Sequence, residues 1–67
     1  MTKLLESLKV LLTNELEMES EANTDVLRAY YRGKAMGVHE VAASGVLSRS
    51  EFAQFLEHYR TEKARFN

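Results

Sequence analysis

No proline interrupts the 67 residues of this chain, and glycine occurs at only three positions. These two residue types are the strongest helix breakers, so long uninterrupted helices are permitted. Apolar side chains recur at three- and four-residue spacing in three successive segments, which is the pattern of amphipathic helices. The sequence therefore predicts an all-α fold, a small three-helix domain that takes up residues 1–67. We expect its helices at about 2–18, 24–44 and 49–66, with the last two joined by a short turn into a helix hairpin.

Local sequence signals set the ends of these helices. Thr24 can accept a hydrogen bond from a free backbone amide in the first turn of the second helix, as can Asn23. Gly45 can adopt the left-handed conformation that closes a helix. Ser48 and Glu51 have the spacing of a capping box, in which each side chain satisfies a backbone amide of the other residue. We therefore expect a well-defined turn between the second and third helices.

Residues 40–52 also resemble the calcium-binding loop of the EF-hand family. Gly45 stands at the position of the turn glycine of that loop, and Glu51 at the position of its closing glutamate. The family uses oxygen-bearing side chains at the first, third and fifth positions, and the third is Ala42, which cannot ligate calcium. A glycine cap followed by a capping box explains the same residues without a metal. We therefore expect no metal site and no cofactor.

The size of the chain limits its core. A chain of this length buries only about 60% of the surface that it exposes when unfolded. The sequence contains no cysteine, so disulfides cannot add stability. We expect the core to be completed by oligomerisation, as a homodimer or a larger homo-oligomer. The residues expected in this oligomer core are large, apolar and drawn from the first and third helices: Leu5, Leu8, Leu12, Phe52, Phe55 and Tyr59.

The sequence also gives an expectation for the cellular location of the protein. Absence of cysteine fits a reducing cytosol. Glu6 and Lys9 interrupt the first apolar run, unlike the core of a signal peptide. No segment approaches the ~20 consecutive apolar residues that cross a bilayer. We expect a cytoplasmic protein with no membrane partner.

Small residues recur along the second helix. Ala29, Gly33 and Gly37 are each four residues apart, which clears a shallow groove along one side of a helix. Each glycine in a helix interior costs roughly 1 kcal/mol relative to alanine, so a compensating contact is expected. We predict close packing of another helix in this groove, from the same chain or from a second copy. A break of the helix near Gly33 is the structural alternative.

Acidic side chains concentrate in the first third of the chain. Residues 1–25 carry six acids and two bases, whereas residues 26–67 carry four acids and seven bases. Residues 15–21 place a glutamate at every second position, and glutamates four apart in a helix repel each other. We expect the first helix to fray or end within this run, as a solvated helix end. The functional interpretation is a contact surface for a basic protein partner, formed by Glu15, Glu17, Glu19, Glu21 and Asp25.

The second helix brings basic and aromatic side chains together. Arg28, Tyr31, Arg32 and Lys34 have the chemistry to bind phosphate groups and to stack on nucleobases. They give an alternative function, a nucleic-acid or nucleotide binder. No known recognition motif accompanies them, and the chain has a net charge of −1. Nucleic acid is therefore the secondary expectation.

Catalysis has little support. His39 and His58 each have a glutamate as sequence neighbour, but adjacent residues of a helix point about 100° apart and do not form a pair. No serine has a base that can be assigned to it. The sequence therefore favours a non-enzymatic interaction protein, a regulatory or inhibitory adaptor that binds another protein as a homo-oligomer. A purely structural subunit that contacts only copies of itself is the third interpretation.

Overall fold

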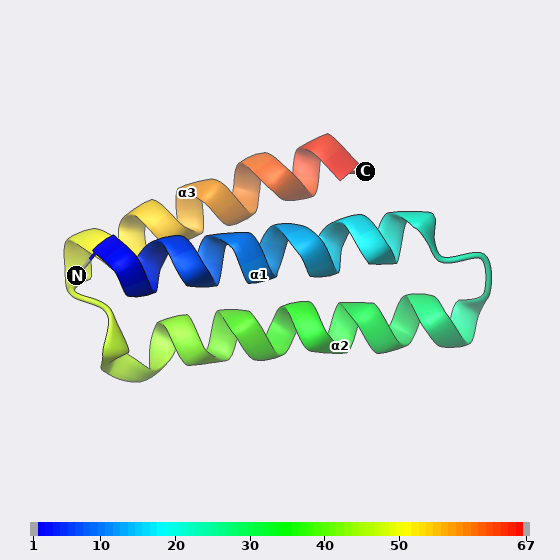
Figure 1. Ribbon diagram of the computed structural model, residues 1–67, viewed down its shortest axis with the longest axis horizontal. Coiled ribbons are helices and arrows are strands. Elements are labelled where there is room, and N and C mark those ends of the chain that lie inside the picture. The colour runs from blue at the N-terminus through cyan, green and yellow to red at the C-terminus, as the bar shows by residue number, and fades with distance from the viewer. Residues whose placement is uncertain (1, 67) are drawn as a thin grey trace.

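The computed structural model describes residues 2–66, and for Thr2 only the backbone. These residues form three α-helices: α1 (Thr2–Glu21), α2 (Asp25–Val41) and α3 (Arg49–Phe66). A π-helical turn, η1 (Ala42–Val46), follows α2. In Figure 1, α1 lies in the middle, α2 runs antiparallel along one side of it, and α3 runs along another side in the same direction as α1. The predicted all-α domain is confirmed, and α1 is its central element.

The core is built around one face of α1. Leu5, Leu8, Leu12 and Leu16 are all buried on this helix, at the three- and four-residue spacing of a single helical face. They pack with the fully buried Phe55 of α3 and with the remaining buried apolar side chains Ala35, Ala42 and Leu47. Val38, Phe52, Leu56, Tyr59 and Phe66 pack against this cluster while staying partly exposed.

The predicted oligomer core therefore needs correction. Leu5, Leu8, Leu12 and Phe55 are buried within the single chain, where none of them is more than 5% exposed. Phe52 and Tyr59 lie at the edge of the same core. The three helices together cover the apolar face that the sequence had left without a partner, because α1 packs against both α2 and α3. Leu5, Leu8, Leu12 and Phe55 are therefore not available to a second copy, whereas a contact through the partly exposed Phe52 and Tyr59 stays a prediction.

The predicted capping signals at the helix ends are confirmed. The Thr24 hydroxyl accepts a hydrogen bond from the backbone N–H of Leu27, at 3.1 Å. Ser48 Oγ accepts from the Glu51 N–H at 3.1 Å, and Glu51 Oε1 accepts from the Ser48 N–H at 2.9 Å, which completes the capping box. Gly45 has a φ of 100°, in the left-handed region that favours glycine. These contacts fix the turn between α2 and α3.

Substitution of Ser48 by alanine is expected to destabilise the fold by about 1 kcal/mol, because the N–H of Glu51 loses its acceptor. Urea denaturation followed by circular dichroism measures this change. Ser7→Ala is the matched control, since Ser7 is exposed in the interior of α1, where alanine is the better helix former. Equal midpoints for Ser48→Ala and the wild type would contradict the role of the cap.

Two helix boundaries differ from those predicted. α1 continues to Glu21, three residues beyond the expected end at about 18. Glu15 and Glu19 form ion pairs with α2, which offsets their repulsion, and the Ser20 hydroxyl donates to the carbonyl of Glu17. The regular part of α2 ends at Val41 rather than near residue 44, because the chain widens into η1 before the left-handed glycine.

The glycines of α2 do not break the helix, and they do not receive another helix of the same chain. α2 runs without interruption from Asp25 to Val41, so the predicted alternative of a break near Gly33 is wrong. A Cβ atom added at Gly33 or Gly37 would have no neighbouring atom within 4 Å. Packing of a second copy against Ala29, Gly33 and Gly37 stays a prediction.

The open space around Gly33 makes its replacement informative. Gly33→Ala is expected to raise the free energy of unfolding by up to about 1 kcal/mol, since alanine favours the helix and meets no obstacle. Thermal unfolding at low protein concentration measures this. A lower melting temperature that falls further behind the wild type as concentration rises would show that a second chain packs on this glycine.

Candidate functional site

The acidic run does not form one surface. Glu15 and Glu19 turn toward α2, where Glu15 pairs with Lys34 at 3.4 Å and Glu19 pairs with Arg32 at 3.0 Å. Their side chains are only 14% and 16% exposed. Glu17 and Glu21 point to solvent and form no ion pair with any residue that the structure describes. Two of the five acids of the predicted contact surface therefore hold α1 and α2 together.

Asp25, the fifth predicted acid, is fully exposed and pairs with Arg28 at 2.9 Å. Glu17, Glu21 and Asp25 are thus the acids of the predicted set that a partner could reach.

The basic and aromatic residues predicted to bind nucleic acid lie in two different places. Arg28 and Arg32 lie beside a cavity at one end of the bundle, whereas Lys34 turns away from it toward Glu15. Tyr31 lies with Lys34, whose ammonium is 5.8 Å from the centre of that ring. The four residues therefore do not line a single nucleic-acid-binding face.

One side of the α1–α2 pair carries six of the exposed large apolar side chains, while others, such as Met36, lie elsewhere. We call this side the outer face. On α1 it contains Leu4, Leu11 and Met18, and on α2 it contains Leu27, Tyr30, Lys34 and Val41. The three α1 residues are seven apart, as are Leu27, Lys34 and Val41, so each set follows one line along its helix. The six apolar members each remain between 40% and 55% exposed.

The outer face lies opposite α3. Thr13 marks the side of α1 that contacts α3, since its hydroxyl bonds to two α3 side chains. At 100° per residue, Leu11 lies about 160° around the helix from Thr13. His39 marks the α3 side of α2, because its ring centre lies 5.5 Å from that of Tyr59. Val41 lies about 160° from His39 by the same measure. The α1–α2 layer is therefore covered by α3 on one side only.

A single ion pair occupies the middle of the outer face. Lys34 Nζ lies 3.4 Å from Glu15 Oε2 and 5.2 Å from the centre of the Tyr30 ring. The pKa of Lys34 is raised: partial desolvation lowers it, but the Glu15 carboxylate, Tyr30 and Tyr31 together raise it by more. The ammonium is therefore charged throughout the neutral range. Glu15 Oε1, the other carboxylate oxygen, is buried and accepts no hydrogen bond from the residues that the structure describes.

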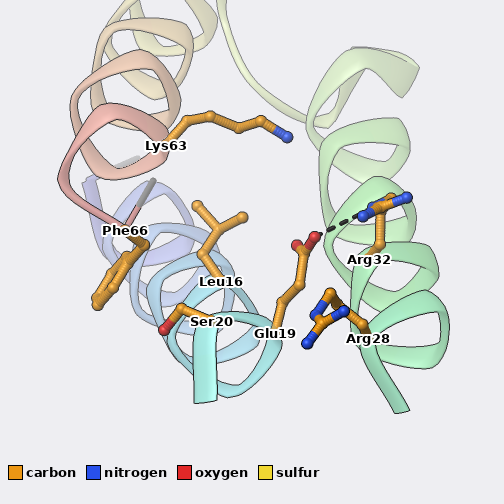
Figure 2. A pocket seen from close by; sticks show the side chains of 7 residues that line it. All are labelled: Leu16, Glu19, Ser20, Arg28, Arg32, Lys63 and Phe66. Carbon is orange, nitrogen blue, oxygen red and sulfur yellow. Dashed lines mark hydrogen bonds and ion pairs between the residues drawn. The ribbon is translucent and has the colours of Figure 1, made fainter. Parts of the chain in front are cut away.

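A second candidate site, after the outer face, is a cavity of about 260 Å³ between the end of α1, the start of α2 and the end of α3. We call it the bundle-end cavity. Figure 2 shows Lys63 reaching from α3 toward α2, with Leu16 beneath and Arg28 and Arg32 on the opposite wall. The complete lining is Leu16, Glu19, Ser20, Arg28, Arg32, Lys63 and Phe66. Three bases and one acid give this cavity a positive balance.

A buried polar network between α1 and α3 was not predicted from the sequence. The Thr13 hydroxyl donates to Glu62 Oε1 at 3.2 Å and lies 2.8 Å from His58 Nε2. Arg65 pairs with the same carboxylate at 3.2 Å, so the buried Glu62 is well satisfied. The sequence did contain a signal, because Glu62 follows Phe55 by seven residues and so lies on the buried line of α3. The tautomer of His58 decides whether its Nε2 donates to this hydroxyl or accepts from it.

Removal of the Thr13 hydroxyl should therefore affect stability. Thr13→Val preserves the shape of the side chain but deprives the buried Glu62 carboxylate of a donor, and a loss of about 1–3 kcal/mol is expected. Denaturant unfolding measures it. Thr61→Val is the control, since Thr61 is exposed on the same helix as Glu62. A loss of similar size in both variants would mean that the network does not stabilise the fold.

Within residues 2–66, no group of three or more histidine or acidic side chains is placed to hold a metal ion. Nor does any described helix combine the length and apolar character required to cross a membrane. No protein-family model, curated protein or solved structure that was compared with this chain matches it.

Proposed function

We propose that the protein is a non-enzymatic interaction protein that acts as a homodimer, with the outer face as the surface between the two copies. The observation that carries this proposal is the one-sided covering of the α1–α2 layer. Six large apolar side chains lie aligned on the uncovered side, each 40% to 55% exposed. Large exposed apolar side chains gathered on one face are typical of protein interfaces.

A second copy fits this face better than an unrelated apolar surface. A two-fold axis through the middle of the face would bring Lys34 of each copy near Glu15 of the other. The two residues have opposite charges, so the contact is self-complementary, as a two-fold interface requires. The more accessible oxygen, Glu15 Oε2, already pairs with Lys34 of its own chain, and the ammonium of a second Lys34 is a suitable further donor to this carboxylate.

The strength of the contact can be bounded. Complete burial of a large apolar side chain contributes about 1.5–3 kcal/mol, and these side chains are already about half buried. Twelve such side chains in two copies contribute on the order of 10 kcal/mol. This is comparable to the association cost of about 4–15 kcal/mol. We therefore expect a reversible dimer whose population depends on protein concentration.

The test is the absolute mass in solution, measured by size-exclusion chromatography with light scattering at several protein concentrations. The chain has a mass of 7.7 kDa. The expected result is a rise from this value toward twice this value as the concentration increases. A constant monomer mass would contradict the proposal, and so would growth beyond the dimer, because a two-fold contact closes on itself.

The adaptor role predicted from the sequence depends on a second, basic protein, and its contact is now limited to Glu17, Glu21 and Asp25. Support comes from Glu17 and Glu21, whose carboxylates form no ion pair with the residues in the described range. Reversal of both charges to lysine is expected to abolish partner capture while the circular dichroism spectrum stays helical. Capture that survives the reversal would place the contact elsewhere.

A further inference from the structure

The bundle-end cavity lies outside the proposed dimer interface. Arg32, on its wall, is about 160° around α2 from Lys34, which belongs to the outer face. The cavity therefore stays open to solvent whether or not the chain dimerises. Its properties depend on residues from three helices, which only the folded chain brings together.

The charges around the cavity are unequal. Arg28, Arg32 and Lys63 contribute three positive charges, and Glu19 contributes one negative charge. Arg28 is held in place by its own neighbours: Nη1 donates to Asp25 and Nη2 donates to the carbonyl of Ala22, at 2.9 and 3.1 Å. Its position is therefore fixed, and the Asp25 carboxylate offsets part of its positive charge.

Arg32 and Lys63 have donors to spare. Arg32 uses Nε to bond to Glu19, at 3.0 Å, and its two terminal nitrogens bond to no other residue between 2 and 66. Lys63 has no carboxylate partner in that range. Its ammonium lies over the ring of Tyr59, 6.0 Å from the ring centre. Glu19 orients the guanidinium of Arg32, as the dashed line in Figure 2 shows. A fork of two N–H groups and a nearby ammonium form a donor set suited to phosphate oxygens.

The remainder of the cavity is apolar and small. Leu16 is buried beneath the gap between Lys63 and Arg32, and Phe66 is a partly buried ring at the far side. The volume of about 260 Å³ lies just below the range of roughly 300–1,000 Å³ that holds drug-sized ligands. The cavity thus has room for one phosphate group and a compact organic substituent.

We propose that the bundle-end cavity binds a small phosphate monoester. The phosphate lies between the terminal nitrogens of Arg32 and the ammonium of Lys63, with Arg28 behind, and the organic part lies against Leu16 and Phe66. This site differs from the nucleic-acid face expected from the sequence, because it contains Lys63 and excludes Tyr31 and Lys34. It accommodates one phosphate rather than a strand.

The experiment is a nuclear magnetic resonance titration of the ¹⁵N-labelled full chain with phenyl phosphate at constant ionic strength. Inorganic phosphate and benzoate are the comparison ligands, since one lacks the apolar part and the other lacks the second charge. Lys63→Gln and Arg32→Gln are the test variants. Arg60→Gln is the matched control, because Arg60 is an exposed base on α3 that pairs with Glu57 outside the cavity. A dispersed spectrum verifies the fold of each variant.

Phenyl phosphate is expected to shift the backbone amides of Arg32 and Lys63 saturably and to bind more tightly than either comparison ligand. Lys63→Gln should weaken it at least about tenfold, as expected for loss of a charge-assisted hydrogen bond, whereas Arg60→Gln should leave it nearly unchanged. Lys63→Arg should retain binding. Non-saturating shifts, or equal losses in Lys63→Gln and Arg60→Gln, would overturn the proposal. Tighter binding of a deoxythymidine oligonucleotide, with an affinity that falls steeply with salt, would overturn it in favour of a nucleic-acid surface.

Discussion

Replacement of Phe55 by alanine is expected to lower the free energy of unfolding of this protein by about 3–5 kcal/mol. Phe55 is fully buried, with 0% of its surface exposed, and it joins α3 to the leucines of α1. Truncation of a buried phenylalanine costs about 3–5 kcal/mol, because apolar contacts are lost and a cavity remains. A domain of this length has a total stability of only roughly 3–10 kcal/mol. One substitution thus removes a large part of the stability.

The measurement is thermal unfolding followed by circular dichroism. Val26→Ala is the matched control, since Val26 is an apolar residue of α2 that is 79% exposed, and its truncation should leave the transition unchanged. Phe55→Leu should lie between the two, because it keeps most of the apolar volume. A Phe55→Ala variant that melts within a few degrees of the wild type would show that the core does not depend on the contact between α1 and α3.

The second large effect concerns the proposed dimer. Leu11→Glu should reduce self-association at least about a hundredfold, since a carboxylate would replace an apolar side chain at the middle of the outer face and would do so twice in a symmetric pair. Val10→Glu is the matched control. Val10 precedes Leu11 on α1 and is similarly exposed, at 59% against 48%, but it points about 100° away. Light scattering across a concentration series compares the two.

A charge exchange tests the same interface from its ion pair. Lys34→Glu should weaken the dimer, because it places like charges beside Glu15 in both copies. The double variant Glu15→Lys with Lys34→Glu should recover much of the association, since opposite charges then face each other again. Loss in the single variant without recovery in the double one would mean that Lys34 contributes by packing on Tyr30 and not by pairing across the interface.

The local features of the fold could be predicted because their signals are close together in the sequence. The capping box can be recognised from the spacing of Ser48 and Glu51. The left-handed conformation of Gly45 can be predicted from the residue type, because glycine adopts it most readily. The three helices follow from apolar periodicity alone. The choice of buried residues was harder. Leu4 and Leu5 both lie on the apolar half of α1, and only the positions of α2 and α3 decide that Leu5 is buried and Leu4 remains exposed.

The candidate sites were less predictable because their members meet only in three dimensions. Glu15 and Glu17 look equivalent in the sequence, yet one faces α2 and the other faces solvent. Arg32 and Lys63 are 31 residues apart, and nothing local relates them. The end of α1 lies later in the sequence than predicted for a similar reason. Arg32 and Lys34 of α2 pair with glutamates of α1 that would repel one another in an isolated helix.

The central position of α1 has a consequence for synthesis of the chain. The ribosome completes α1 and α2 before α3, and only the short segment Ala22–Thr24 separates the first two helices. A nascent α1–α2 pair would have apolar residues on both of its sides, because Phe55 has not yet covered the leucines of α1. The chain is then most prone to aggregation or chaperone capture. Emergence of α3 from the ribosome ends that interval, because Phe55 then covers the leucines of α1 while the outer face stays exposed.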